Sequence, residues 1–472
     1  MKKYLYILAA AVVAVMAWSC QKDTEGGGET PTPAAPTAIT LSTSTIEAQR
    51  TGGDFSVTVT APSRPSVSAK PDWVTVQDGT FNKDTYKMTL TLKVAAYGEY
   101  GSREGQVTIS AGSLSQTLKI TQQGREKPEI VDVDIDTELV TQGANAEVQA
   151  LYDYLLSQYG KKTISAVMAD VNWNTTIAQN VYQQAGKYPA MNCFDFIQVY
   201  VPDGNGWINY NDLTPVTSWA EAGGIVSLMW HFNVPLTETT TIGTDGSGVT
   251  CTTSKTAFKA SNALKDGTWE NKWYKENLEK VATIILALQE KGIAAIWRPY
   301  HEAAGNYYAL NYKGSAWFWW GAEGPDTFKA LWNDMFAYFK EKGIKNLIWV
   351  WTAQGYNGSM SEYDSDEAYY PGDDKVDVVA RDLYGFNAAN NGVEFTLLQN
   401  TYNHKMITLG ECGWGNNGAT AFSSVSDFWT EGAKWSWFMP WYSDKYTMVS
   451  TDWWKAAFAL DYVITREDLP EL

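Results

Sequence analysis

The sequence predicts an α/β protein in which a (β/α)8 TIM barrel follows a small all-β sandwich domain. From about residue 136 onward, short apolar strand-like runs alternate with helical patterns eight times. Residues 39–124 instead show short alternating runs that Gly and Pro turns separate. The chain has 472 residues, of which 44% are hydrophobic, so substantial cores are possible. A disordered or fibrous chain is therefore excluded.

Residues 1–20 have the pattern of a signal peptide. Two lysines precede an apolar run from Tyr4 to Ala17, and a polar stretch follows it directly. The run is too short to cross a bilayer comfortably, which argues against the alternative of a transmembrane helix. Ser19-Cys20 resembles the end of a bacterial lipobox. This resemblance implies a lipoprotein whose mature chain begins at a lipidated Cys20.

Residues 21–38 are rich in Gly, Pro, Thr and Glu, a composition that predicts a flexible linker. Their first five residues are similar to the acidic export tags of Bacteroidetes surface lipoproteins. We therefore expect an outer membrane lipoprotein at the cell surface or facing the periplasm, which contacts the membrane through its lipid anchor only. The odd number of remaining cysteines, Cys193, Cys251 and Cys412, indicates free thiols.

Residues 39–124 contain segments that resemble the BACON module of Bacteroidetes carbohydrate-active proteins. These segments are Pro71-Asp72-Trp73-Val74, Gly101-Ser102-Arg103-Glu104-Gly105 and Leu118-Lys119-Ile120-Thr121-Gln122-Gln123-Gly124. The family name implies carbohydrate binding. Trp73 is the only Trp in this stretch and suits a core position, so we favour a spacer that holds the following domain away from the membrane.

Residues 136–472 are predicted to form the catalytic barrel. Its eight strands are Thr163–Met168, Ala190–Phe196, Gly224–His231, Ala294–His301, Asn346–Thr352, Asp377–Tyr384, Met406–Glu411 and Trp435–Trp441. Clear helical spacing is found at Trp269–Lys291 and Asp326–Lys342. A doubly wound open sheet is the alternative, but no Gly-x-Gly-x-x-Gly turn follows the first strand. Barrel active sites lie at the carboxyl ends of strands, which confines the search to eight positions.

Two carboxylates stand out at the strand ends. Glu302 closes the fourth strand and Glu411 closes the seventh, and these ends face each other across a closed barrel. Retaining glycosidases use two carboxyl groups about 5–5.5 Å apart, one as nucleophile and one as acid/base. Arg298 is expected to donate to Glu411 and keep it ionised. The alternative is that each Glu forms a structural ion pair.

The composition favours a sugar ligand over nucleic acid. A formal net charge of −17 repels a phosphate backbone. The chain has 22 Trp and 27 Tyr, and aromatic faces stack on the C–H faces of sugars while acidic and amide groups bind the hydroxyls. Most of these aromatic residues nevertheless pack the core.

The strand-end residues resemble glycoside hydrolase family 26, the β-mannanases. Most of this clan of barrel enzymes places Asn before the acid/base, whereas family 26 has His, as His301-Glu302 does here. Further matches are Trp230-His231, Trp317-Phe318-Trp319-Trp320-Gly321, Asp382-Leu383-Tyr384-Gly385 and Met439-Pro440-Trp441. Together these matches extend over the barrel from about residue 136 to the end.

The resemblance implies that Glu302 is the acid/base and Glu411 the nucleophile. The substrate-binding residues that we infer are His301 and Tyr384 at the −1 sugar, Trp317 and Trp441 as stacking platforms, and Asp195, Trp230, His231 and Arg298. One departure from the family is the segment Tyr307–Lys313 between Glu302 and Trp317, where the family usually has a short link. We expect this segment to narrow a subsite or to form an extra one.

The implied activity is hydrolysis of β-1,4-mannosidic bonds in mannan, glucomannan or galactomannan with retention, by a monomer that needs no cofactor or metal. The alternatives are another β-glycanase acting on xylan or mixed-linkage glucan, a non-catalytic surface glycan-binding lipoprotein, and a structural surface module. Internal or chain-end cleavage and tolerance of galactose branches stay open, because loops around the cleft decide them.

Three other patterns that could indicate a zinc site, a Ser-His-Asp hydrolase or a calcium loop each lack a required residue. His301-Glu302-Ala303-Ala304-Gly305 begins like a zinc-binding helix but has Gly where the second His must stand. A Ser-His-Asp hydrolase lacks its Gly-x-Ser-x-Gly elbow. The segment Thr244–Gly248 lacks the closing Glu of a calcium loop and is expected to be a rim loop.

Overall fold

The computed structural model describes residues 34–201, 206–305, 316–353, 367–414, 422–444 and 446–471. The predicted signal peptide, Cys20, most of the linker and the Tyr307–Lys313 segment lie outside these ranges. The chain divides into two compact units. One comprises the residues up to Ala95 and Glu104–Thr121, and the other Ala96–Arg103 and Gln122 to the C-terminus.

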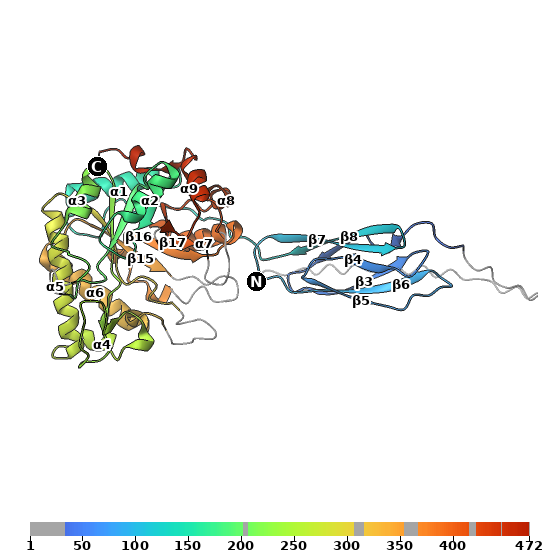
Figure 1. Cartoon of the computed structure of the whole chain (residues 1–472), viewed down its shortest axis with the longest axis horizontal. Helices are drawn as coiled ribbons and strands as arrows, with labels where there is room; N and C mark the ends of the chain where they lie inside the picture. Colours follow the sequence, from blue (N-terminus) through green and yellow to red (C-terminus); the bar gives the residue numbers. More distant parts are fainter. Residues whose placement is uncertain are drawn as a thin grey trace, which may run out of the picture. The chain divides into compact units, whose positions relative to one another are not determined.

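The first unit is built on two antiparallel four-stranded sheets, ordered β1-β3-β6-β5 and β2-β8-β7-β4 (Figure 1). The strands are β1 Thr40–Leu41, β2 Thr45–Ala48, β3 Gly53–Thr60, β4 Ser66–Ala69, β5 Val74–Asp78, β6 Lys87–Val94, β7 Ser102–Ala111 and β8 Leu114–Gln123. Every second residue of β6 is buried, and Leu90 and Leu92 share one core with Val107 of β7. Trp73 is partly buried against this core.

The second unit contains a closed barrel of eight parallel strands. Their order is β10-β11-β14-β15-β16-β17-β18-β9, and β9 also pairs with β10, which closes the sheet. The bounds are β9 Thr163–Met168, β10 Met191–Asp195, β11 Ile225–Met229, β14 Ala295–Arg298, β15 Leu347–Ala353, β16 Val378–Tyr384, β17 Met406–Gly413 and β18 Trp437–Pro440. This confirms the predicted fold class and every predicted barrel strand. A short β21 (Val463–Ile464) is added beside β9.

Helices surround this barrel (Figure 1). They are α1 Ala146–Gln158, α2 Thr176–Ala185, α3 Thr214–Glu221, α4 Ala260–Ala263, α5 Trp269–Gln289, α6 Pro325–Lys342, α7 Ala388–Thr401, α8 Val425–Thr430 and α9 Thr451–Phe458. The helix α6 starts on a proline and ends at Gly343, whose positive φ of 78° glycine adopts without strain. Within the described ranges, no helix combines the length and the apolar content that crossing a membrane requires.

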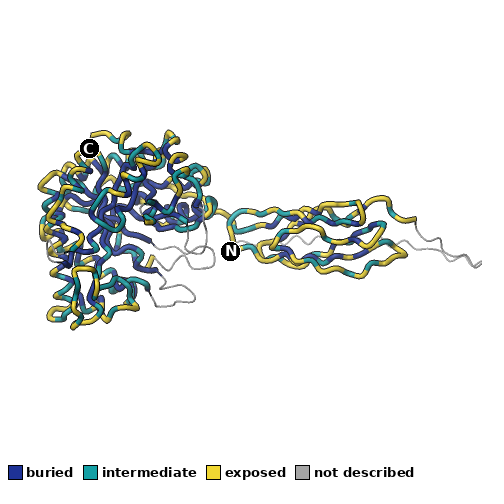
Figure 2. Tube along the Cα trace, in the orientation of Figure 1, coloured by how far each residue is buried: buried dark blue, intermediate teal, exposed yellow. Residues whose placement is uncertain are grey.

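The strands separate two apolar layers, because successive side chains point to opposite faces of the sheet. In β15, Ile348 and Val350 pack inside the barrel, whereas Trp349 and Trp351 pack outside it under the helices. Figure 2 shows this buried centre and the exposed outer surfaces of the helices. Short hairpins, β12 Val234–Pro235 with β13 Val249–Thr250 and β19 Tyr442–Ser443 with β20 Tyr446–Thr447, follow the carboxyl ends of β11 and β18.

Removing one interior side chain is expected to destabilise the barrel. Replacing Ile348, which is 0% exposed, by Ala should lower the free energy of unfolding by about 2–5 kcal/mol, because it leaves a cavity. Urea unfolding followed by tryptophan fluorescence reports this unit, since all Trp residues except Trp18 and Trp73 come after residue 136. The matched change Ile130→Ala, at a 50% exposed position, should stay within about 0.5 kcal/mol. Equal losses of unfolding free energy in the two variants would contradict the role of interior packing.

Candidate active site

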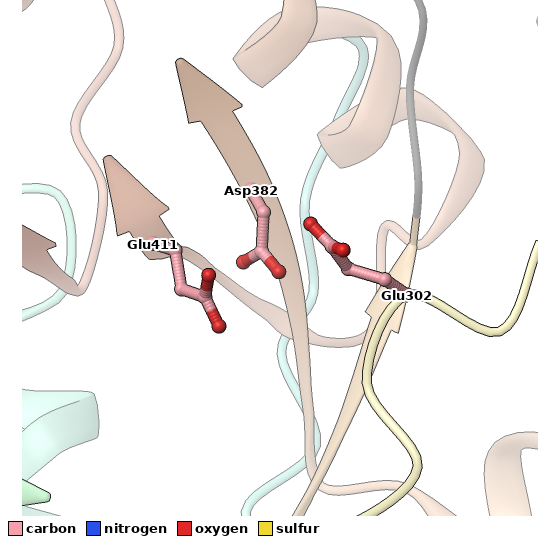
Figure 3. A group of neighbouring side chains, drawn as sticks. All are labelled: Glu302, Asp382 and Glu411. Carbon is pink, nitrogen blue, oxygen red and sulfur yellow. The ribbon is translucent and has the colours of Figure 1, made fainter. Parts of the chain in front are cut away.

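Three carboxylates meet at the carboxyl ends of three barrel strands. Glu411 lies on β17, Asp382 lies on β16, and Glu302 follows β14. Figure 3 shows Asp382 between the other two, with the side chain of Glu302 directed toward it. One oxygen of each carboxylate lies within 4.8 Å of the others. The predicted pair therefore comes together, and the structure adds a third acid.

A bulge in β17 sets the position of Glu411. Leu409 pairs with Arg381, but Glu411 pairs with Asp382, so Gly410 is the extra residue. A Cβ at Gly410 would lie 2.6 Å from Asp382 Oδ1 and 3.2 Å from Arg298 Nε. Only glycine therefore fits beside the ion pairs, and the bulge aligns the two acids across adjacent strands.

Arg298 joins two of these acids. Its Nη1 and Nη2 donate to Glu411 Oε1 at 2.8 and 2.6 Å, and Nη2 also donates to Asp382 Oδ2 at 2.7 Å. The guanidinium is 3% exposed, and its Nε donates to Thr352 Oγ1 at 3.0 Å. Charge-assisted bonds of this kind are short and directional. The sequence predicted the contact with Glu411, and the structure adds the contact with Asp382.

Both oxygens of Glu411 are engaged. Arg298 binds Oε1, and the Tyr384 hydroxyl donates to Oε2 at 2.7 Å. Burial and the charge of Asp382 raise the pKa of Glu411, whereas Arg298 and Tyr384 oppose that rise. Since these donors bind the ionised form directly, we assign the negative charge to Glu411. An ionised carboxylate held in one orientation suits a nucleophile.

Glu302 has the opposite environment. Burial raises its pKa well above the ordinary value, and the charges of Asp382 and Glu411 raise the pKa further. Glu302 is also hydrogen-bonded to Asp382, and that bond raises the pKa of Glu302 again. The Arg298 guanidinium bonds Asp382 and Glu411 but not Glu302, so we assign the proton to Glu302. A protonated acid beside an ionised one is the arrangement that general acid catalysis requires.

The backbone around Glu302 is strained. Tyr300 and Glu302 have positive φ angles of 49° and 52°, a region that costs non-glycine residues about 1–3 kcal/mol. The surrounding structure holds this conformation: Tyr300 is buried, its hydroxyl bonds that of Tyr274 at 3.4 Å, and Gly305 N donates to Glu302 O at 2.9 Å. Such strain often marks residues whose position is functionally determined.

Two histidines flank the carboxylates. His231 Nδ1 lies 2.6 Å from Asp195 Oδ2, and its backbone N–H donates to Asp195 Oδ1 at 3.1 Å. Burial lowers the pKa of His231, but Asp195 outweighs this effect and the net pKa is raised. The ring of His301 lies 4.7 Å from that of His231. Burial, then His231 and Arg298, lower the pKa of His301 well below its ordinary value, so this ring is neutral at pH 7.

Two of the three predicted tryptophans lie beside this cluster. The Trp441 ring is 5.9 Å from that of His231. Trp317 packs on Gly305, where a Cβ would meet its ring at 2.2 Å, and its backbone N–H donates to Gly305 O at 3.2 Å. Trp317 therefore lies against Gly305, three residues after Glu302.

Trp230 requires a correction. It is 1% exposed, stacks on Phe232 with 3.6 Å between ring centroids, and belongs to the apolar layer outside the barrel strands. It therefore has a packing role and not the substrate-binding role that we inferred. Asp382, by contrast, belongs to the site but was not among the site residues that we inferred. Its position at the end of the sixth strand was visible in the sequence, but its contacts with Arg298 and Glu302 depend on the folded barrel.

Comparison with known proteins identifies the domains. The family model for glycosyl hydrolase family 26 matches residues 140–468, and the BACON model, a putative N-terminal binding domain, matches residues 63–123. A mannan endo-1,4-beta-mannosidase of Thermothelomyces thermophilus is 31% identical over 71% of this chain and 64% of its own length. Mannan endo-1,4-beta-mannosidase B of Piromyces sp. is 26% identical over 65% and 48%. The chain thus spans about half to two thirds of the length of these relatives.

Solved structures show the same similarity. The family 26 domain of an endo-beta-mannanase/endo-beta-glucanase from Prevotella bryantii is 51% identical, with a TM-score of 0.68 over 71% of this chain and 99% of that domain. The beta-mannanase of a symbiotic protist of the termite Reticulitermes speratus, solved with a gluco-manno-oligosaccharide, is 30% identical, with a TM-score of 0.58 over 72% and 100%. Because the family model covers most of the chain, this protein belongs to glycosyl hydrolase family 26.

Proposed function

We propose that this protein is an endo-acting β-mannanase type enzyme that hydrolyses β-1,4-mannosidic bonds in mannan, glucomannan or galactomannan with retention of configuration. The observation that carries the proposal is the pair of Glu302 and Glu411, whose nearest carboxyl oxygens lie within 4.8 Å. Retaining enzymes have carboxyl groups about 5–5.5 Å apart, whereas inverting enzymes need about 6.5–9.5 Å to admit a water. The names of the similar enzymes support mannan as the backbone.

In the first step, Glu411 attacks the anomeric carbon while Glu302 gives its proton to the departing glycosidic oxygen. A covalent glycosyl-enzyme forms, and Glu302 is left as a carboxylate. In the second step, Glu302 takes a proton from water, and the resulting hydroxide displaces Glu411 from the sugar. Arg298 and Tyr384 bind Glu411 throughout, so they orient its attack and stabilise it when it leaves.

A glucan backbone is the second candidate. The Prevotella bryantii protein is named both endo-beta-mannanase and endo-beta-glucanase. Initial rates on mannan, xylan and mixed-linkage glucan, measured side by side, decide between the candidates, and we expect mannan to give the highest rate. An absence of mannan hydrolysis with activity on another polysaccharide would refute the mannanase proposal.

We further propose that Cys20 anchors the mature protein in the outer membrane, on the basis of the apolar run before Cys20 and the polar stretch after it. The change Cys20→Ser should release the protein from the membrane fraction after expression in a Gram-negative host. Incorporation of labelled palmitate gives the direct measurement. Labelling of the variant at the level of the wild type would contradict this anchor.

Removing either acid should abolish most of the turnover. We expect kcat on mannan to fall by at least about a thousandfold for Glu411→Ala, and by about 10²–10⁴-fold for Glu302→Gln, since each supplies a separate chemical role. Binding of mannan in an affinity gel should remain close to that of the wild type. The exposed change Glu341→Ala is the matched control and should leave kcat unchanged. Full turnover by the Glu411→Ala variant would refute the assignment.

Asp382 should set the alkaline limit of activity. Its charge raises the pKa of Glu302, so Asp382→Asn lowers that pKa and Glu302 loses its proton at lower pH. The alkaline limb of the kcat/KM profile, measured on mannohexaose, should therefore move toward lower pH. Asp266→Asn, an exposed change, should leave the profile in place. An unmoved or alkaline-shifted limb in the Asp382 variant would contradict this role.

A further inference from the structure

We propose that Trp207 is the stacking platform of a distal sugar-binding subsite on the rim of the barrel, which holds a β-linked hexose of the substrate chain several units away from the cleaved bond. This inference rests on the proposed function, because it assumes a polysaccharide substrate in the cleft. The starting observation is exposure: Trp207 is 53% exposed, whereas most large aromatic residues of the barrel unit are buried. An exposed indole face is available to stack against a ligand.

The platform is at the catalytic end of the barrel. Trp207 lies in the connection between β10 and α3, and the segment that contacts it lies between β12 and β13, after β11. Both connections leave the carboxyl ends of their strands. The same two ends carry Asp195 and His231, which contact each other beside the carboxylates. A chain bound at the carboxylates can therefore extend over this part of the rim.

The platform is held in place before any ligand binds. Gln198, which is 1% exposed, accepts a bond from Ile208 N at 2.9 Å and donates through Nε2 to Thr244 O at 3.0 Å. One amide thus ties the connection after β10 to the hairpin after β11. The Tyr210 hydroxyl donates to Asp195 O at 2.9 Å and anchors the same connection to the strand end. A preorganised platform loses little conformational entropy when a sugar binds.

The indole packs against a glycine. Gly246 has a φ of 85°, and a Cβ built on it would lie 3.2 Å from Trp207 Cη2 and 3.7 Å from the Tyr200 hydroxyl. The backbone of Gly246 therefore supports the outer edge of the indole, while about half of the side chain remains open to solvent. This brings the rim segment Thr244–Gly248, which resembled a calcium loop, into contact with the proposed subsite.

Tyr200 and Asp245 flank the glycine on which the indole packs. Tyr200 is 7% exposed, and its hydroxyl has no hydrogen-bond partner among the residues that the structure describes. This hydroxyl is itself buried beside Gly246, so Tyr200 supports the rim segment and does not offer its hydroxyl to a sugar. Asp245 accepts two bonds from Ser247 on Oδ1, at 3.0 and 2.6 Å, and these bonds lower its pKa. An exposed aromatic face with an exposed carboxylate close to it is a combination typical of carbohydrate sites.

The test compares substrates of different length. For Trp207→Ala, we expect kcat/KM on a mannan polysaccharide or mannohexaose to fall by roughly fivefold to tenfold, the loss of one stacking contact. Hydrolysis of mannotriose should stay at the wild-type level, because that substrate is too short to reach the platform. Trp207→Phe should recover most of the loss, since it restores an aromatic face.

Tyr182→Ala is the matched control. Tyr182 is 43% exposed but lies on α2, away from the connections that follow β10 and β11, so its removal should not change the dependence on chain length. Equal losses on mannotriose and mannohexaose, or no loss on either, would overturn the subsite.

The measurements distinguish a failure of the proposed subsite from a failure of the proposed function. If the wild type cleaves mannohexaose but Trp207→Ala shows no length dependence, the subsite is wrong and the function stands. If the wild type cleaves no mannan, the function is wrong. In that case, affinity gels with mannan, xylan and mixed-linkage glucan test the subsite. The Trp207→Ala variant should migrate faster than the wild type in at least one of these gels. Identical migration in all three gels would refute the subsite.

Discussion

The buried guanidinium of Arg298 is the contact on which the rest of the site depends. It is the cation that two carboxylates from adjacent strands share, and it is almost completely removed from solvent. Leaving one partner of such a buried network uncompensated costs about 3–5 kcal/mol. Arg298 therefore makes it possible for Asp382 and Glu411 to be ionised so close together, and it leaves Glu302 as the acid that keeps its proton.

The barrel gives Arg298 and its partners their positions. Closure between β9 and β10 places the strand ends in a ring, and the bulge at Gly410 puts Glu411 opposite Asp382. The apolar layers on both sides of the strands hold this ring rigid. The local strain at Tyr300 and Glu302 is then maintained by the burial of Tyr300 and by the bond from Gly305 N to Glu302 O.

The proposed subsite on the rim extends the site beyond the bond that is cleaved. In the proposed function, the carboxylates carry the chemistry, and the connections after β10 and β11 contact a more distant part of the substrate chain. Gln198 joins these two connections, and Trp207 and Tyr200 are thereby fixed close to one another. Binding energy from such remote contacts contributes to catalysis only when it helps to position the bond that is cleaved.

By itself, the sequence determined the eight strands, because their apolar runs and the intervening helical spacing are local patterns. It also determined the pair Glu302 and Glu411, since both follow from counting strand ends and from the His301-Glu302 motif. The roles of these acids as acid/base and nucleophile stay predictions until the variants are measured. The tertiary structure alone decided the rest. Trp230 and His231 are adjacent, yet alternation at the strand end places one in the packing layer and the other beside Asp195. Asp382 joins the site only because closure and the bulge bring three carboxyl groups around one guanidinium, and interactions between residues so distant in sequence leave no local pattern.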